Sequence, residues 1–406
     1  MANISIDHIQ MLDRILVALA QSLDITKTQY DNLVRSYGAV GEYLDGDPLL
    51  TNYHPVISPQ GSLRLGTIIQ PVCDDDDLDV DLVIRITEKP HIWAQYDLKN
   101  HIGTRLKAHG IYSNMLDEEG RRCWTILYRQ DTDDAKERYH MDILPSVADR
   151  EYSERIKRME NSSFSTSNID DIAIRITDTK SVDYRTSTNI MTWLKSNPDG
   201  YAMWFASRCQ ANKGFQNRAI ASIVPVDKYV QEKTILQRIV QILKRHRDII
   251  FNGDEDKPIS IIITTLSAKA YQGENSLFEG LNNVIDRMEM FITRNYDGSY
   301  SIENPVNPKE NFADKWKSHP QRRDNFFKWL RKLKEDRAAI LSNKGIELRE
   351  TFSKVFGKDM AIKAFSDMTK THKKDAINGK LKIASTGIIG SIGQQLNAAN
   401  TFFGDN

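Results

Sequence analysis

The segment LDVDLVIRI, residues 78–86, constrains the fold most, because acidic and apolar side chains alternate along it. Successive side chains of a β-strand point to opposite faces, so Asp79 and Asp81 share one face. The other face is predicted to pack on the core through Leu78, Val80, Leu82 and Ile84. Two like charges side by side on a half-buried strand repel each other, which a divalent cation such as Mg²⁺ would relieve. A strand whose exposed face merely carries two acids has the same pattern.

A Gly-Ser pair, Gly61-Ser62, precedes these acids and is followed by a short helix-like stretch. Glycine lets backbone N–H groups approach a phosphate closely, the serine hydroxyl adds a donor, and a helix N-terminus favours an anion. Alone, the pair indicates only a turn. Together with the acidic strand it indicates phosphate binding. The acidic run at residues 74–77 is interpreted as a solvated loop.

A third carboxylate is expected, because in-line displacement at phosphorus with two metal ions needs one ion at the attacking oxygen and one at the leaving group. Asp142 is the best candidate, since it alternates with apolar residues in the strand-like segment 139–147. The alternative is a carboxylate neutralised by a neighbouring arginine such as Arg138. Asp149 and Asp133, both in loop-like sequence, are weaker candidates.

The charge balance gives no steering toward nucleic acid. Lysine and arginine (55) equal aspartate and glutamate (55), whereas proteins that bind duplex DNA are usually basic. A small-molecule substrate is therefore the default. No stretch reaches the roughly 18 apolar residues of a membrane span, so we expect no membrane contact. Cys73, Cys123 and Cys209 match neither a zinc ribbon nor a disulfide framework, which is typical of a reducing cytoplasm.

The hydrophobic period divides the chain into four predicted segments. Residues 56–227 are predicted to form an α+β core, and residues 228–385 a helical lobe. Residues 1–55 are predicted to form two helices, 5–23 and 27–44, that bridge the core and the helical lobe. Residues 386–406 are predicted to be a mobile tail. Further strands are predicted at residues 123–129, 139–147 and 173–178, and a loop at residues 196–201.

QGSLRLGT (60–67), LDVDLV and a lone aspartate on a later strand resemble the cGAS/DncV-like nucleotidyltransferases (CD-NTases). Segments 196–205, 242–248, 257–268 and 304–316 also resemble bacterial members, so the resemblance covers roughly residues 55–320. It implies an α+β fold: a polymerase-β-type core, with a mixed sheet and flanking helices, plus a C-terminal helical lobe of the oligoadenylate-synthase type. The active site is then expected in the cleft between them.

The resemblance also implies roles for individual residues. Gln60, Gly61 and Ser62 would contact the triphosphate, and Asp79, Asp81 and Asp142 would hold two Mg²⁺ ions, which Mn²⁺ can replace. From the helical lobe, Lys244 and Ser260 would contact the triphosphate. From the residues alone, Arg245 or Arg247 fits the place of Lys244 equally well, and Ser260 also fits a helix N-cap. Tyr184 and Tyr201 are guesses for base-stacking groups.

Family members make cyclic oligonucleotide second messengers from nucleoside triphosphates in bacterial anti-phage defence. The resemblance therefore implies synthesis of a cyclic di- or trinucleotide, with ATP as one expected substrate, pyrophosphate as by-product and a downstream effector that binds the product. The alternatives are a linear nucleotidyltransferase acting on RNA or a small acceptor, and a non-catalytic nucleotide-binding regulator. The chain lacks the cysteines of the zinc insertion in the animal DNA sensor, so no obligate DNA activator is expected. Phe402-Phe403-Gly404 is loosely compatible with C-terminal conjugation to a partner.

Overall fold

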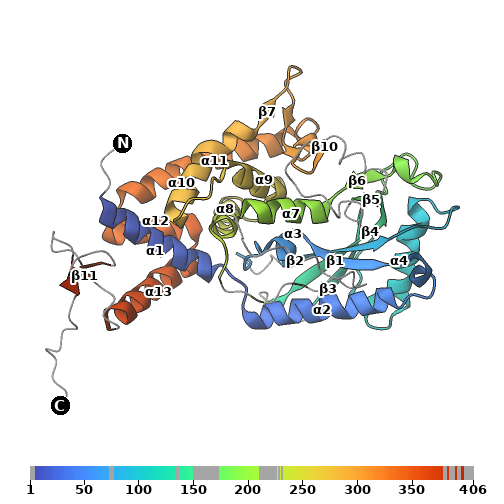
Figure 1. Ribbon diagram of the computed structural model, residues 1–406, viewed down its shortest axis with the longest axis horizontal. Helices are drawn as coiled ribbons and strands as arrows, with labels where there is room; N and C mark the ends of the chain where they lie inside the picture. The colour runs from blue at the N-terminus through green and yellow to red at the C-terminus, as the bar shows by residue number, and fades with distance from the viewer. Residues whose placement is uncertain are drawn as a thin grey trace, which may run out of the picture.

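The computed structural model describes residues 5–72, 77–130, 132, 137–149, 173–209, 226, 229, 232–377, 382–383, 389–390 and 395–396. Figure 1 shows a lobe built on a β-sheet beside a lobe built of helices, with α7 and α8 lying between them. The α+β fold expected from the sequence is confirmed. Among the described residues, no helix combines the length and apolarity needed to cross a membrane.

The two predicted N-terminal helices are confirmed as α1 (Ile6–Ser22) and α2 (Lys27–Asp45). Thr26 and Gln29 cap the N-terminus of α2 with a reciprocal capping box, in which each side chain accepts from the other's backbone N–H. The two helices serve different cores. α1 packs against α8, α10 and α13 of the helical lobe, whereas α2 packs against β1 of the sheet lobe.

Within the described residues, six strands form one mixed sheet in the order β1-β2-β4-β5-β6, with β3 also paired to β4. The strands are β1 (Val56–Gln60), β2 (Leu78–Ile86), β3 (Trp124–Tyr128), β4 (Tyr139–Ala148), β5 (Ile174–Ile176) and β6 (Leu194–Ser196). β2 and β4 run parallel, and the other neighbouring strands run antiparallel. β3 and β5 share one edge of β4, β3 along its first half and β5 along its last residues.

The apolar face of β2 anchors the sheet core, as the alternation predicts. Its four predicted core residues are at most 3% exposed. They pack with side chains of α2 and of α4 (Gln95–Ala108) in one cluster. The short helix α3 (Gly61–Leu65) and the linker that follows it connect β1 to β2. The opposite face of β2 is thereby left free to carry its acids.

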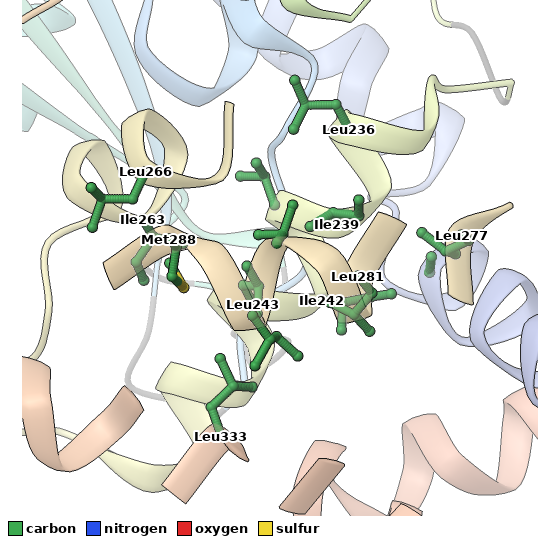
Figure 2. Packing of buried hydrophobic residues seen from close by; sticks show 14 of the residues in the cluster. Leu236, Ile239, Ile242, Leu243, Ile263, Leu266, Leu277, Leu281, Met288 and Leu333 are labelled. Atoms are coloured by element: carbon green, nitrogen blue, oxygen red, sulfur yellow. The ribbon is translucent and has the colours of Figure 1, made fainter. Parts of the chain in front are cut away.

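The helical lobe has its own core, centred on α8. Its described helices are α7 (Pro198–Arg208), α8 (Ile235–Ile250), α9 (Ser260–Ala270), α10 (Leu277–Arg287), α11 (Pro320–Ser342), α12 (Gly345–Phe356) and α13 (Lys358–Ile377). Figure 2 shows α8 contributing Leu236, Ile239, Ile242 and Leu243 to this core. Because the apolar stripe of α8 is buried in this core, the polar stripe on its other side contacts the sheet lobe.

Two parts of the chain differ from the sequence-based expectation. The predicted loop 196–201 is the end of β6 and the start of α7, because Asn197 caps the helix and Pro198 occupies its first turn. The helical lobe also contains short strand pairs that were not predicted, β7 (Thr293–Arg294) with β8 (Tyr300–Ser301) and β9 (Glu303–Asn304) with β10 (Asn307–Asn311).

Part of the expected tail, 386–406, is described as strands. β12 (Ile389–Gly390) and β13 (Gln395–Leu396) pair with β11 (Lys382–Ile383) in a small sheet. The Phe402-Phe403-Gly404 segment, on which the conjugation hypothesis rests, lies outside the described residues.

Candidate active site

Asp79, Asp81 and Asp142 form one cluster on the polar face of the sheet. Parallel pairing of β2 with β4 sets Asp81 directly opposite Asp142, and Asp79 lies on the same face two residues earlier. One carboxylate oxygen of each residue lies within 4.8 Å of the others. The side chain of Asp79 is 57% exposed, while Asp81 and Asp142 are half-buried. Three hard oxygen ligands that converge from two strands suit a divalent cation.

The cluster is electrostatically unfavourable without a cation. Burial, followed by the charges of Asp79 and Asp142, raises the pKa of Asp81 well above its ordinary value. His140 and Lys244 act in the opposite direction on the Asp81 pKa without cancelling the shift. A bound divalent ion would remove the repulsion and stabilise the ionised carboxylates.

Two residues that the sequence analysis missed hold the carboxylates in place. Thr125 on β3 pairs with Asp142 and donates its Oγ1–H to Asp142 Oδ1 at 2.5 Å. His140 on β4 pairs with Asp79, and its Nε2 lies 3.1 Å from Asp79 Oδ1. This hydrogen bond raises the pKa of His140 to about 9. Alternation within each strand puts His140 on the face of Asp142, but only strand pairing brings Thr125 there.

The Gly61-Ser62 turn lies directly against Asp81. Gln60, the last residue of β1, pairs with Asp81. Gly61 then adopts φ 61°, in the left-handed region that favours glycine. A Cβ atom at Gly61 would lie 1.8 Å from Asp81 Oδ2. Glycine is therefore required both by the backbone conformation and by the closeness of the carboxylate, and the predicted turn and the predicted acids meet in space.

Lys244 approaches the acids from α8. Its side chain is buried, and its Nζ donates to the carbonyl of Thr67 at 3.1 Å. Burial, together with the charge of Arg247, lowers the pKa of Lys244 to about 8, while Asp248 and Asp79 act in the opposite direction. Lys244 thus interacts with the acid cluster across the boundary between the lobes. Arg245, the alternative considered for this place, donates to the carbonyl of Gln70.

Ser260 lies beside Arg247, whose Nη1 donates to Ser260 Oγ at 2.8 Å. It is the first residue of α9, and Ile259 occupies the N-cap position, so the interpretation of Ser260 as an N-cap is wrong. The extended backbone that precedes the helix ends at Ile259, which leaves the serine side chain inside the first turn. Arg247 therefore ties Ser260 to the helix that carries Lys244.

Of the competing candidates, the structure describes Asp149 and Arg138, and both have other partners. Asp149 forms a fully buried ion pair with Arg175 on β5. Arg138 pairs with Asp77 at 3.4 Å, so it is not the partner of Asp142. Asp133 lies outside the described residues.

The two tyrosines guessed as base-stacking groups are buried in this structure. The hydroxyl of Tyr201 is hydrogen-bonded to Thr265 inside the helical lobe, and Tyr184 packs edge-on against Tyr96. Both guesses are therefore wrong for the structure as it stands, because neither ring presents a face for stacking.

The raised pKa of Asp81 predicts the effect of Asp81→Asn on stability. A carboxyl group whose pKa is higher in the folded than in the unfolded state destabilises the fold when ionised, and this destabilisation disappears as the pH falls below the ordinary carboxyl pKa. In a chelator at about pH 7.5, Asp81→Asn should raise the melting temperature, and the gain should vanish toward about pH 4. Differential scanning calorimetry at both pH values measures this. A variant that is less stable than the parent at the higher pH would contradict the described electrostatics.

The bond from Thr125 to Asp142 predicts a second effect. Partners that orient a metal ligand contribute about 10- to 100-fold to metal affinity. Thr125→Val removes the hydroxyl at nearly constant volume and should weaken Mn²⁺ binding by about that factor, whereas Thr125→Ser should retain most of it. Calorimetric titration with Mn²⁺ provides the comparison. Equal affinities in the valine and serine variants would show that this hydroxyl does not position Asp142.

Known proteins resemble this chain in sequence and in fold. Residues 11–180 match the model of the Second Messenger Oligonucleotide or Dinucleotide Synthetase domain. A c-di-GMP synthase of Roseivirga ehrenbergii is 28% identical over 404 residues, which cover 97% of each chain.

Solved structures share the fold at lower identity. The Bradyrhizobium diazoefficiens CD-NTase CdnG in complex with GTP aligns with a TM-score of 0.61 and 18% identity over 88% of this chain and 99% of its own. The GTP-bound form of Vibrio cholerae DncV aligns with a TM-score of 0.51 and 14% identity over 86% of this chain and 89% of its own. The chain therefore contains a region similar to the Second Messenger Oligonucleotide or Dinucleotide Synthetase domain and shares the fold of the CD-NTase structures.

Proposed function

We propose that this chain joins nucleoside triphosphates into a cyclic di- or trinucleotide second messenger and releases pyrophosphate. The observation that carries the proposal is the three-carboxylate cluster facing the Gly61 turn, which unites a metal site with a phosphate-binding backbone. In each round, a 3′- or 2′-hydroxyl attacks the α-phosphate of a second nucleotide. A new P–O bond forms, the bond to pyrophosphate breaks, and the last round closes the ring.

The carboxylates of Asp79, Asp81 and Asp142 would hold two Mg²⁺ ions. Bound ions of this kind lower the pKa of the attacking hydroxyl and neutralise the charge that develops on the leaving group. His140 and Thr125 keep two of the carboxylates oriented for this task. All three acids are present and converge, which favours an active enzyme over a non-catalytic regulator.

The triphosphate would lie between the turn and α8. Gln60, Gly61 and Ser62 contribute polar groups at the end of β1, next to Asp81. Lys244 contributes a positive charge from the opposite lobe, and its ammonium group has three donors, of which the described structure gives one a partner, Thr67. Ser260 is assigned to the same phosphate surface through its bond to Arg247.

GTP is the first substrate to test. The relative from Roseivirga ehrenbergii is named a c-di-GMP synthase, and both solved structures compared above contain GTP. ATP, expected from the sequence, is the second, since another neighbour of the same fold was solved with ATP. The product would act through a downstream effector in anti-phage defence.

The function is tested by incubating the purified protein with Mg²⁺ and labelled nucleotides, singly and in pairs. We expect a phosphatase-resistant product whose mass corresponds to nucleotides joined with loss of one pyrophosphate each, because ring closure leaves no terminal phosphate. Asp79→Asn/Asp81→Asn, which removes two of the three carboxylates, should lower the rate by at least about 1,000-fold.

Glu347→Gln/Glu350→Gln is the matched control, because it removes two exposed carboxylates of α12, and it should retain the parental rate. A product that phosphatase degrades would instead establish linear nucleotidyl transfer. Equal rates in the parent and the double variant would refute the metal-site assignment.

A further inference from the structure

One stripe of α8 binds the backbone of the linker that follows the phosphate-binding turn. We call residues 65–70 the linker. The carbonyls of Leu65, Thr67, Ile68 and Gln70 accept hydrogen bonds from α8 side chains at 2.6–3.1 Å. The donors are, in the same order, Gln237, Lys244, Gln241 and Arg245. Their spacing puts all four on one face of the helix. The α8 side chains thus hold the linker through hydrogen bonds to its main-chain carbonyls.

The linker connects the turn to Lys244 through two hydrogen bonds. The backbone N–H of Thr67 donates to the carbonyl of Ser62 at 2.9 Å, and the carbonyl of Thr67 accepts from Lys244. The five-residue α3 is too short to be stable by itself, since isolated helices of this length do not form in water. The position of Ser62 relative to Lys244 therefore depends on where the linker lies.

Gln241 is the donor best placed to fix that position. It is fully buried. Its Nε2 donates to the carbonyl of Ile68, next to Thr67, and to Asp24 Oδ1, both at 2.9 Å, while its Oε1 accepts from Arg238 at 3.2 Å. Both amide protons and the amide oxygen are used, so the side chain has one orientation. Unlike Lys244, it has no remaining donor for a phosphate.

We propose that Gln241 is a positioning residue for nucleotide binding: it anchors the linker at Ile68 so that the Ser62 turn and Lys244 keep the spacing of one triphosphate. The inference rests on the proposed function, because it assigns both groups to the same ligand. Asp24, at the junction of α1 and α2, orients the Gln241 amide and is itself paired with Lys233 and Arg238. Gln241 thereby connects the linker of the sheet lobe, α8 of the helical lobe and the junction of the N-terminal helices.

The chain offers an exchange that separates this anchoring from stability. Gln241→Glu loses the donor to Ile68 and places a carboxylate beside Asp24, so it should destabilise the protein. Asp24→Asn/Gln241→Glu restores a donor–acceptor pair and the local net charge, with Arg238 already beside position 241. The bond to Ile68 remains lost in this double variant, because a carboxylate cannot donate to a carbonyl. Asp24→Asn alone keeps that bond and is the matched control.

We expect the double variant to recover most of the melting temperature lost by Gln241→Glu, yet to keep a KM for the nucleotide raised by about tenfold, with a smaller change in kcat. Hydrogen exchange of the linker amides in the nucleotide-free protein should be faster in the double variant than in Asp24→Asn. In Asp24→Asn, KM should rise less than in the double variant, because the amide oxygen of asparagine can still accept from Gln241 and the bond to Ile68 is kept.

A double variant with parental KM and parental linker exchange would overturn the proposal, and so would a KM that recovers in step with the melting temperature. If the double variant does not refold, linker exchange in Gln241→Asn, whose amide is one methylene too short to reach Ile68, decides the matter in the same way. A parent protein that makes no nucleotide product would instead contradict the proposed function, while the exchange measurement would still test the anchoring.

Discussion

The parallel pairing of β2 with β4 is the interaction on which the site depends. It sets Asp81 opposite Asp142 and Asp79 opposite His140, so that three carboxylates share one face of the sheet. Their mutual repulsion is unfavourable without a bound cation. The opposite face of β2 supplies the compensation, since its apolar side chains are almost completely buried against α2 and α4. The stability of the sheet core therefore holds the repelling charges together. A divalent cation at this cluster would relieve their repulsion.

The second constraint is the contact between the lobes. The apolar stripe of α8 belongs to the helical core, while its polar stripe holds the linker between the turn and β2. Gly61 lies so close to Asp81 that no side chain fits between the turn and the acid cluster. The Gly61 turn is thus tied to the acid cluster by close packing and to Lys244 by hydrogen bonds through Thr67. Such preorganisation favours catalysis, because little reordering is needed when the transition state forms.

Alternation and turn chemistry were enough to predict the strands that carry Asp79, Asp81 and Asp142, the two N-terminal helices and the Gly61 turn. These features depend on local periodicity and on a backbone conformation that glycine favours. The roles of Thr125 and Gln241 could not be predicted in this way, because each depends on which distant segments pair. Nothing in CWTILYR shows that β3 lies beside Asp142, and a glutamine in a helical stripe looks solvent-exposed until the linker packs on it.

The errors have local causes. Asn197-Pro198 is typical of loops, but the same pair also starts helices well, and here Asn197 caps α7. Serine favours the N-cap position, but α9 begins at Ser260 itself, one residue earlier than an N-cap there requires. Tyr184 and Tyr201 were chosen as aromatic residues without information on their burial.

The most direct test of the central claim is a crystal structure with Mn²⁺ and a non-hydrolysable nucleoside triphosphate, in which anomalous scattering locates the metal ions. The account predicts two anomalous peaks bounded by Asp79, Asp81 and Asp142, with the triphosphate between the Gly61 turn and Lys244. Peaks elsewhere, or a triphosphate bound without contact to these carboxylates, would contradict it.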